Sequence, residues 1–213
     1  MYLPHHFEET RVEELHRVIS EYALGILVSN GPNGLDANHL PFELNPNAGE
    51  RGHLIAHVAR ANPLWQEAKG GDEVLVIFRA ADAYVSPNWY PSKHEFHRQV
   101  PTWNYQAVHV HGKIKIHDDE RFVRGVVARL TRVNEARTGS DKPWKMTDSS
   151  KEYIDQMLTA IVGIEIEITR LIGKWKLSQN REERDRMNAA EELHKRGEQV
   201  MSTAMRNAAV SRK

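Results

Sequence analysis

The stretch from residue 108 to residue 117 alternates between two kinds of side chain, and this alternation constrains the fold more than any other feature. The apolar set is Val108, Val110, Gly112, Ile114 and Ile116, and the polar set is His109, His111, Lys113, Lys115 and His117. Successive side chains of a β-strand point to opposite faces, so the pattern predicts a strand with one face in the core. We expect the glycine to mark a bend or the close approach of another strand. The polar face suits a metal, a phosphate, a nucleic acid or water.

Other stretches have the same extended character and are joined by short turns. We predict further strands at 24–29, 36–44, 53–59, 73–78 and 163–171, and a hairpin turn rich in Gly and Asn between the first two. Helical spacing predicts helices at 11–22 and 63–68, after Asp118 as N-cap, and from about residue 150, while 79–104 is rich in loops. The fold class expected is mainly β with peripheral helices, and a small closed barrel fits better than a βαβ sheet.

The length of 213 residues suits one domain with an appendage. We expect a barrel domain over residues 1–180. Residues 181–213 form a C-terminal helical extension that docks on a partner subunit, or a partly disordered tail.

Composition excludes several classes of function. The 29 Lys and Arg balance the 29 Asp and Glu, so no global field attracts DNA or an acidic membrane. Cysteine is absent, which excludes disulfides, thiolate metal sites and a Cys nucleophile. No export signal or long apolar run occurs, and we expect a cytoplasmic protein without membrane contact.

Histidine pairs raise the question of a metal. His109 and His111 share one strand face, and His94 and His97 form a second pair. A third ligand cannot be identified from the sequence, and we therefore expect no metal. The role of these histidines stays open, including haem binding through His94, His97 or His109.

A phosphate matches the scattered cations better, particularly where aromatic side chains lie nearby. Candidates of both kinds are Arg60, Asn62, Tyr84, Ser86, Trp103, Asn104, Tyr105, Lys174, Lys176, Gln179 and Arg181. Taken singly, each has an ordinary explanation: Trp103 in a core or lid, and Arg60 in a surface ion pair.

Several motifs, in order along the chain, carry a resemblance to a known family. They are YLPHHF near the start, HLPF, HVARANPLW, AYVSPNWY, VPTWNYQAVHVHG, and IVGIEIEIT with GKWKLSQNR. Together they cover residues 1 to about 185 and resemble the PaiB-type family of FMN-binding negative transcriptional regulators.

This resemblance implies an FMN-binding split β-barrel, assembled as a homodimer with flavin at the subunit interface. The family motifs place the cofactor contacts at Arg60, Asn62, Ser86, Thr102, Trp103, Asn104, Tyr105, Lys176, Gln179 and Arg181. Such residue types suit FMN, because a phosphate prefers Arg, Lys and hydroxyl donors while a flavin ring prefers aromatic or apolar surfaces. The polar face of 108–117 should then lie toward the partner subunit or the rim of the cofactor.

The function expected is that of an FMN-binding protein of the PaiB-like regulator family. Two alternatives are a flavin-dependent oxidoreductase acting on a small molecule and a haem-binding or haem-degrading protein without DNA binding. DNA is left open as a partner, although charge does not support it. The single candidate DNA surface is the helix that carries Arg121, Arg124, Arg129 and Arg132.

Overall fold

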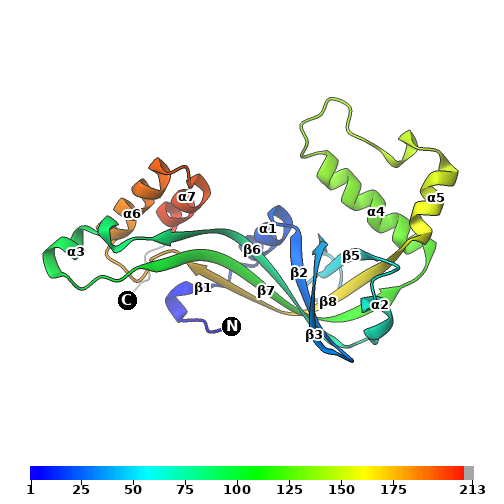
Figure 1. Ribbon diagram of the computed structural model, residues 1–213, viewed down its shortest axis with the longest axis horizontal. Helices are drawn as coiled ribbons and strands as arrows, with labels where there is room; N and C mark the ends of the chain where they lie inside the picture. Colours follow the sequence, from blue (N-terminus) through cyan, green and yellow to red (C-terminus); the bar gives the residue numbers. More distant parts are fainter. Residues whose placement is uncertain (209–213) are drawn as a thin grey trace. The chain divides into compact units, whose positions relative to one another are not determined.

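The computed structural model describes residues 1–208, which divide into two compact units (Figure 1). The first unit contains residues 1–15, 79–108 and those from 172 on, and the second contains 16–78 and 109–171. Three long strands contribute to both units: β6 (Glu73–Val85), β7 (Thr102–His117) and β8 (Ile161–Lys176). No helix among residues 1–208 has the length and apolar character needed to cross a membrane.

Every strand in the hydrogen-bonded order of the sheet contributes residues to the second unit. Its shorter strands are β2 (Leu24–Gly31), β3 (Gly34–Pro41), β4 (Glu43–Asn45) and β5 (His53–Ala59). The hydrogen-bonded order is β3-β2-β6-β7-β8-β5-β4. The predicted hairpin is confirmed, since β2 and β3 are antiparallel and lie side by side (Figure 1), and the turn uses Gly34 at φ 98°.

The predicted antiparallel sheet with peripheral helices is confirmed, but the expectation of a closed barrel is wrong. Within residues 1–208 the sheet is not closed, and its terminal strands are β3 and β4. Strand β3 is suited to the edge of an open sheet, because it is exposed over most of its length. Its polar side chains Asp36 and Asn38 favour contact with water over pairing with a further strand.

Strand β7 has the predicted alternation. Val110 and Ile114 are buried, whereas Lys113 and Lys115 are exposed. Gly112 provides the close approach expected of it, since an added Cβ would lie 2.5 Å from the backbone oxygen of Glu167 in β8. The absence of a side chain at this position therefore permits β7 and β8 to pack.

The helices of the second unit lie between strands along the chain. They are most of α1 (Val12–Glu21), α2 (Leu64–Glu67), α4 (Glu120–Glu135), α5 (Lys151–Thr159) and the short 3-10 helix η3 (Met146–Asp148). Helix α4 packs on β5, where Val126 and Leu130 contact Ile55. Its N-cap is Asp119, which accepts a hydrogen bond from the Phe122 amide, rather than the predicted Asp118.

The first unit contains the far ends of β6, β7 and β8, together with β1 (Glu8–Glu9), which pairs with β8. Its helices are η1 (His5–Phe7), η2 (Pro87–Trp89), α3 (Pro91–Phe96), α6 (Glu183–Lys195) and α7 (Gln199–Asn207). The expectation of loops over 79–104 is corrected, because β6 continues to Val85 and buries Ala80, Ala83 and Val85.

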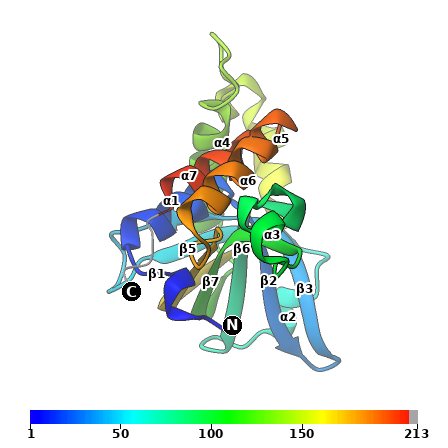
Figure 2. The same ribbon diagram turned by 90° about the vertical axis from the view of Figure 1, so that its left-hand side faces the viewer.

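The C-terminal segment is helical up to Asn207, and α6 and α7 lie side by side (Figure 2). They bury Leu193, Met201 and Met205. The division of the chain at residue 180 stays a prediction, and residues 209–213 of the expected tail lie outside the described residues.

The contact at Gly112 yields a test of the strand packing. We expect Gly112→Ala to lower the free energy of unfolding by about 1–3 kcal/mol, because the new methyl overlaps backbone that cannot move freely. Chemical denaturation monitored by circular dichroism measures the change. The matched control is Gly70→Ala, where nothing lies within 4 Å of the added carbon; equal stabilities of the two variants would contradict the close approach.

Candidate functional site

Three cations gather in the first unit near the end of β8, and we call Lys174, Lys176 and Arg181 the cation cluster. The Lys176 ammonium donates hydrogen bonds to Thr102 Oγ1 and, at 2.6 Å, to the backbone oxygen of Trp103. Burial, and then the charges of Lys174 and Arg181, lower the pKa of Lys176. The cluster therefore concentrates positive charge that the protein itself disfavours.

The partners of the cation cluster are neutral. Lys174 is only 7% exposed; its ammonium donates to the Tyr2 backbone oxygen at 2.9 Å and lies 5.5 Å from the centre of the Tyr105 ring. Arg181 donates to Gln99 Oε1 at 2.7 Å. Within residues 1–208, no carboxylate forms an ion pair with any of the three. A buried lysine without a counter-ion is uncommon, and an anionic ligand would compensate it.

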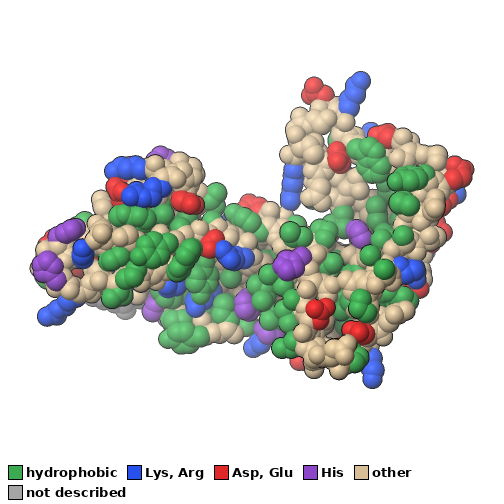
Figure 3. Space-filling model, viewed as in Figure 1, with side chains coloured by type: hydrophobic (Ala, Val, Ile, Leu, Met, Phe, Trp, Pro, Cys, Tyr) green, Lys and Arg blue, Asp and Glu red, His purple; other side chains and the backbone are tan. Residues whose placement is uncertain are grey.

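Exposed aromatic side chains belong to the same unit. Trp103 is 55% exposed and Tyr84 is 47% exposed, and their ring centroids are 6.0 Å apart in an edge-to-face arrangement. In the space-filling view, hydrophobic side chains gather on the surface of the part that carries α3 (Figure 3). Flat aromatic surface thus occurs next to the main-chain oxygen that holds Lys176.

A buried polar layer supports the segment that follows β8. Asn104 is fully buried and donates to Ser178 Oγ at 2.9 Å, and Ser178 has the left-handed φ of 65°. The Gln179 side chain closes the same turn, because it accepts from the Leu177 amide and donates to the Trp175 oxygen. These contacts fix the turn between Lys176 and Arg181.

The predicted site residues are divided between the units. Thr102, Trp103, Asn104, Tyr105, Lys176, Gln179 and Arg181 belong to the first unit, with Ser86, whose side chain caps η2 by accepting from the Asn88 amide. Arg60 and Asn62 belong to the second unit.

The donors of Arg60 and Asn62 are engaged within the second unit. Arg60 forms a bidentate pair with Asp118 and donates to the Thr159 oxygen at 2.7 Å. Asn62 donates to Asn38 and accepts from the Leu64 amide. Both residues stabilise the loop after β5, and their role as cofactor contacts stays a prediction.

Tyr2 was missed by the sequence reasoning. Its backbone oxygen and its ring both contact Lys174, with the ring centre 5.6 Å from the ammonium. The YLPHHF motif contained this residue, but nothing in the local pattern indicated a contact with a strand more than 170 positions away.

The histidines proposed for metal or haem do not gather. His94 and His97 are exposed in and after α3, and His111 accepts a hydrogen bond from Arg170 at 3.1 Å. Burial, and then Arg170, lower the pKa of His111. In the described part of the chain, no group of three or more His, Asp or Glu is arranged to hold a metal ion. Haem binding stays a prediction.

Other histidines form a bridged group in the second unit. Glu165 of β8 lies between His53 Nδ1 at 2.7 Å and His117 Nε2 at 2.8 Å. Burial by itself would raise the pKa of Glu165, but the hydrogen bonds and charges of both imidazoles outweigh it and lower the pKa. The alternating pattern of β7 placed His117 on the polar face but did not identify its partners.

A family model identifies the class of protein that this fold and site define. The model described as "Putative FMN-binding domain" matches residues 1–170. The protein described as "Protease synthase and sporulation protein PAI 2" from Bacillus subtilis is 33% identical over 91% of this chain and 89% of its own length. The chain therefore belongs to the FMN-binding family that the model defines, and its cofactor is FMN. The PaiB-type resemblance is confirmed.

Solved structures support the fold. The FAD and haem binding protein from Mycobacterium smegmatis has a TM-score of 0.56 at 16% identity and covers 79% of this chain and 73% of its own. The flavocytochrome Anf3 from Azotobacter vinelandii has a TM-score of 0.55 at 11% identity and covers 80% of this chain and 70% of its own. At these identities the similarity establishes the split-barrel architecture.

The buried amide of Asn104 should contribute to stability. Asn104→Ala removes the partner of Ser178, and we expect a loss of about 1–3 kcal/mol in the free energy of unfolding because a buried hydroxyl is left without its amide. Thermal and urea denaturation measure it. Asn88→Ala, at an exposed position of the same unit, serves as control, and identical stability of the two variants would contradict the supporting role.

The bridged group predicts a pH dependence. Because its pKa is lowered in the folded state, Glu165 contributes stability above its ordinary pKa of 4.5, and this contribution is lost as the pH falls through the folded pKa. Glu165→Gln should therefore lower the melting temperature at neutral pH. The difference from the native protein should narrow below about pH 4.5, the value at which an unfolded glutamate titrates. A difference independent of pH would exclude the ionised bridge.

Proposed function

We propose that this chain is a homodimeric flavoprotein in which the cation cluster binds the phosphate of FMN. The observation that carries the proposal is the absence of any paired carboxylate on Lys174, Lys176 and Arg181 within the described residues, next to the exposed ring of Trp103. A phosphate would supply the counter-charge that these cations lack.

The donors available match the chemistry of FMN. The Lys176 ammonium provides a compact positive charge, and the Arg181 guanidinium provides paired N–H donors. The Thr102 hydroxyl is beside them, because it accepts a hydrogen bond from Lys176. Trp103 and Tyr84 offer aromatic surface to an isoalloxazine ring. Bound FMN would supply electron or hydride transfer, and the protein would orient it and exclude water.

The exposed aromatic surface supports a dimer. Large side chains of the first unit that remain exposed in the single chain include Tyr2, Tyr84, Phe96, Val100 and Trp103. Of these, Tyr84 and Trp103 are in ring contact, and contiguous exposed apolar surface marks interaction sites more often than isolated apolar residues do. A second copy of the chain would cover them and enclose the flavin ring from the side opposite Trp103.

For the output of flavin binding, we propose regulation. The support is the Bacillus subtilis relative, which is named for protease synthesis and sporulation. Equal numbers of cations and carboxylates provide no general attraction to DNA, so the regulatory state would depend on the flavin site and the partner subunit. A cytoplasmic location stays a prediction from the sequence.

Titration with FMN tests the phosphate site. We expect Lys176→Ala to weaken FMN binding about 10- to 100-fold, because a charge-assisted hydrogen bond to phosphate is lost. Affinity in the native protein should fall as the pH rises through the lowered pKa of Lys176, where the ammonium loses its charge. Quenching of flavin fluorescence measures both effects, and Lys115→Ala, an exposed lysine of the second unit, is the control.

Two results would contradict the proposal. One is equal FMN affinity of the Lys176→Ala and Lys115→Ala variants. The other is a monomer in sedimentation equilibrium at saturating FMN. NADH or NADPH oxidation by the loaded protein would indicate the oxidoreductase alternative instead of regulation.

A further inference from the structure

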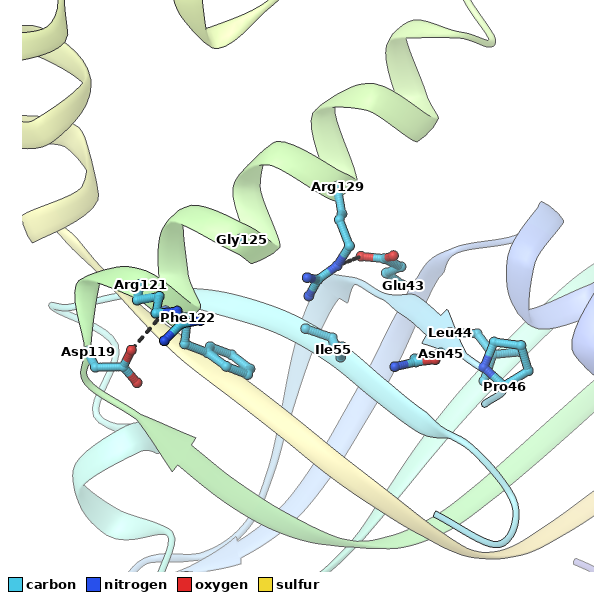
Figure 4. A pocket seen from close by; sticks show the side chains of 10 residues that line it. All are labelled: Glu43, Leu44, Asn45, Pro46, Ile55, Asp119, Arg121, Phe122, Gly125 and Arg129. Carbon is cyan, nitrogen blue, oxygen red and sulfur yellow. Dashed lines mark hydrogen bonds and ion pairs between the residues drawn. The ribbon is translucent and has the colours of Figure 1, made fainter. Parts of the chain in front are cut away.

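A cavity of about 670 Å³ lies in the second unit between α4 and the strands β4 and β5 (Figure 4). Its lining residues are Glu43, Leu44, Asn45, Pro46, Ile55, Asp119, Arg121, Phe122, Gly125 and Arg129. None of the predicted cofactor contacts is among them. The volume is in the range of small-molecule sites, about 300–1,000 Å³.

Gly125 lines the cavity and leaves it open beside α4. It lies in the middle of α4, where glycine is the least favourable residue after proline. Packing among residues 1–208 does not require it, since an added Cβ would meet only Arg129 Nη1 there, at 3.5 Å. This contrasts with Gly112 and Gly163, where a Cβ would overlap neighbouring atoms at 2.5 Å. The missing side chain keeps open a space that the protein does not fill.

The carboxylates that line the cavity have hydrogen-bond partners, whereas the arginines keep unpaired donors in the described part of the chain. The carboxylate of Asp119 accepts from the Phe122 amide, and that of Glu43 accepts from Arg129 Nε at 2.8 Å. Within residues 1–208, the terminal nitrogens of Arg129 have no hydrogen-bond partner, and neither does the guanidinium of Arg121. Figure 4 shows Arg129 reaching from α4 toward Glu43, above Ile55. The donors left available to a ligand are therefore cationic.

The floor of the cavity is flat and apolar. Phe122 stacks on His117, with ring centroids 3.8 Å apart and planes inclined by 6°. Ile55, only 5% exposed, lies beside it in the core under α4. Since His117 is held by Glu165, the orientation of the phenyl ring is fixed before any ligand arrives.

We propose that this cavity binds a flat aromatic carboxylate, with its ring on Phe122 and Ile55 beneath Gly125 and its carboxylate on the terminal nitrogens of Arg129, one of which lies beside Gly125. Guanidinium groups recognise carboxylates through paired N–H donors, and an aromatic ring fits the apolar floor. The site is separate from the cation cluster, whose residues all belong to the other unit.

The experiment uses 2-naphthoate as the probe and the full chain saturated with FMN. Isothermal titration calorimetry should give a dissociation constant on the order of 1 mM or tighter. The neutral analogue 2-naphthamide should bind about tenfold more weakly, because it lacks the charge that Arg129 recognises.

Two variants locate the binding. Gly125→Leu fills the cavity and should weaken naphthoate binding at least tenfold while raising the melting temperature, since leucine favours the helix more than glycine. Its control is Ala128→Leu, an exposed position of the same helix, which should bind as the native protein does. Arg129→Gln should reduce the preference for the acid over the amide, whereas Arg132→Gln, at an exposed position of α4, should preserve it.

The proposal is overturned if acid and amide bind equally, if Gly125→Leu binds naphthoate like the native protein, or if no heat of binding is detected. Competition between FMN and naphthoate would overturn it as well, since the cavity would then be the flavin site. A changed sedimentation coefficient of the Gly125→Leu variant would indicate that a second copy of the chain occupies the cavity. That result would also exclude the small-molecule site.

Discussion

The contact between β7 and β8 at Gly112 is the constraint on which the structure depends. Both strands contribute residues to both units, and their packing leaves no space for a side chain at this position. The alternation of β7 then determines what each face carries: Val110 and Ile114 enter the core, and His117 reaches Glu165. Gly112 thus permits the packing of β7 on β8, and the alternation of β7 places His117 where it pairs with Glu165.

Most of the sheet could be predicted from the sequence, because alternation and turn residues are local signals. The hairpin at Gly34 and the burial of Val110 are examples. The continuation of β6 to Val85 was not predicted, since its Ala and Asp residues have weak strand preference and are extended here by pairing with β7. The cap of α4 was misplaced by one residue because Asp118 and Asp119 are chemically identical. Their partners differ, since Asp118 pairs with Arg60 and Asp119 accepts from the Phe122 amide.

The candidate site was less predictable, for a physical reason. Motifs identified Lys176 and Arg181, but the cluster is significant because no carboxylate of the described residues pairs with it. The spacing of residues in a sequence does not reveal a missing partner. Likewise, Gly125 looks like an ordinary helix defect in the sequence. The structure shows that Gly125 lines an open cavity together with Ile55 and Phe122.

The contact between Lys174 and Tyr2 has a practical consequence for handling the protein. The acceptor of the buried ammonium is the main-chain oxygen of Tyr2, and the strand pairing of Glu8 with Lys174 holds that segment in place. An affinity tag fused ahead of Met1 would crowd the cation that lies beside the proposed phosphate position. Flavin content is therefore best measured on protein in which residues 1–9 are unchanged and carry no attached tag.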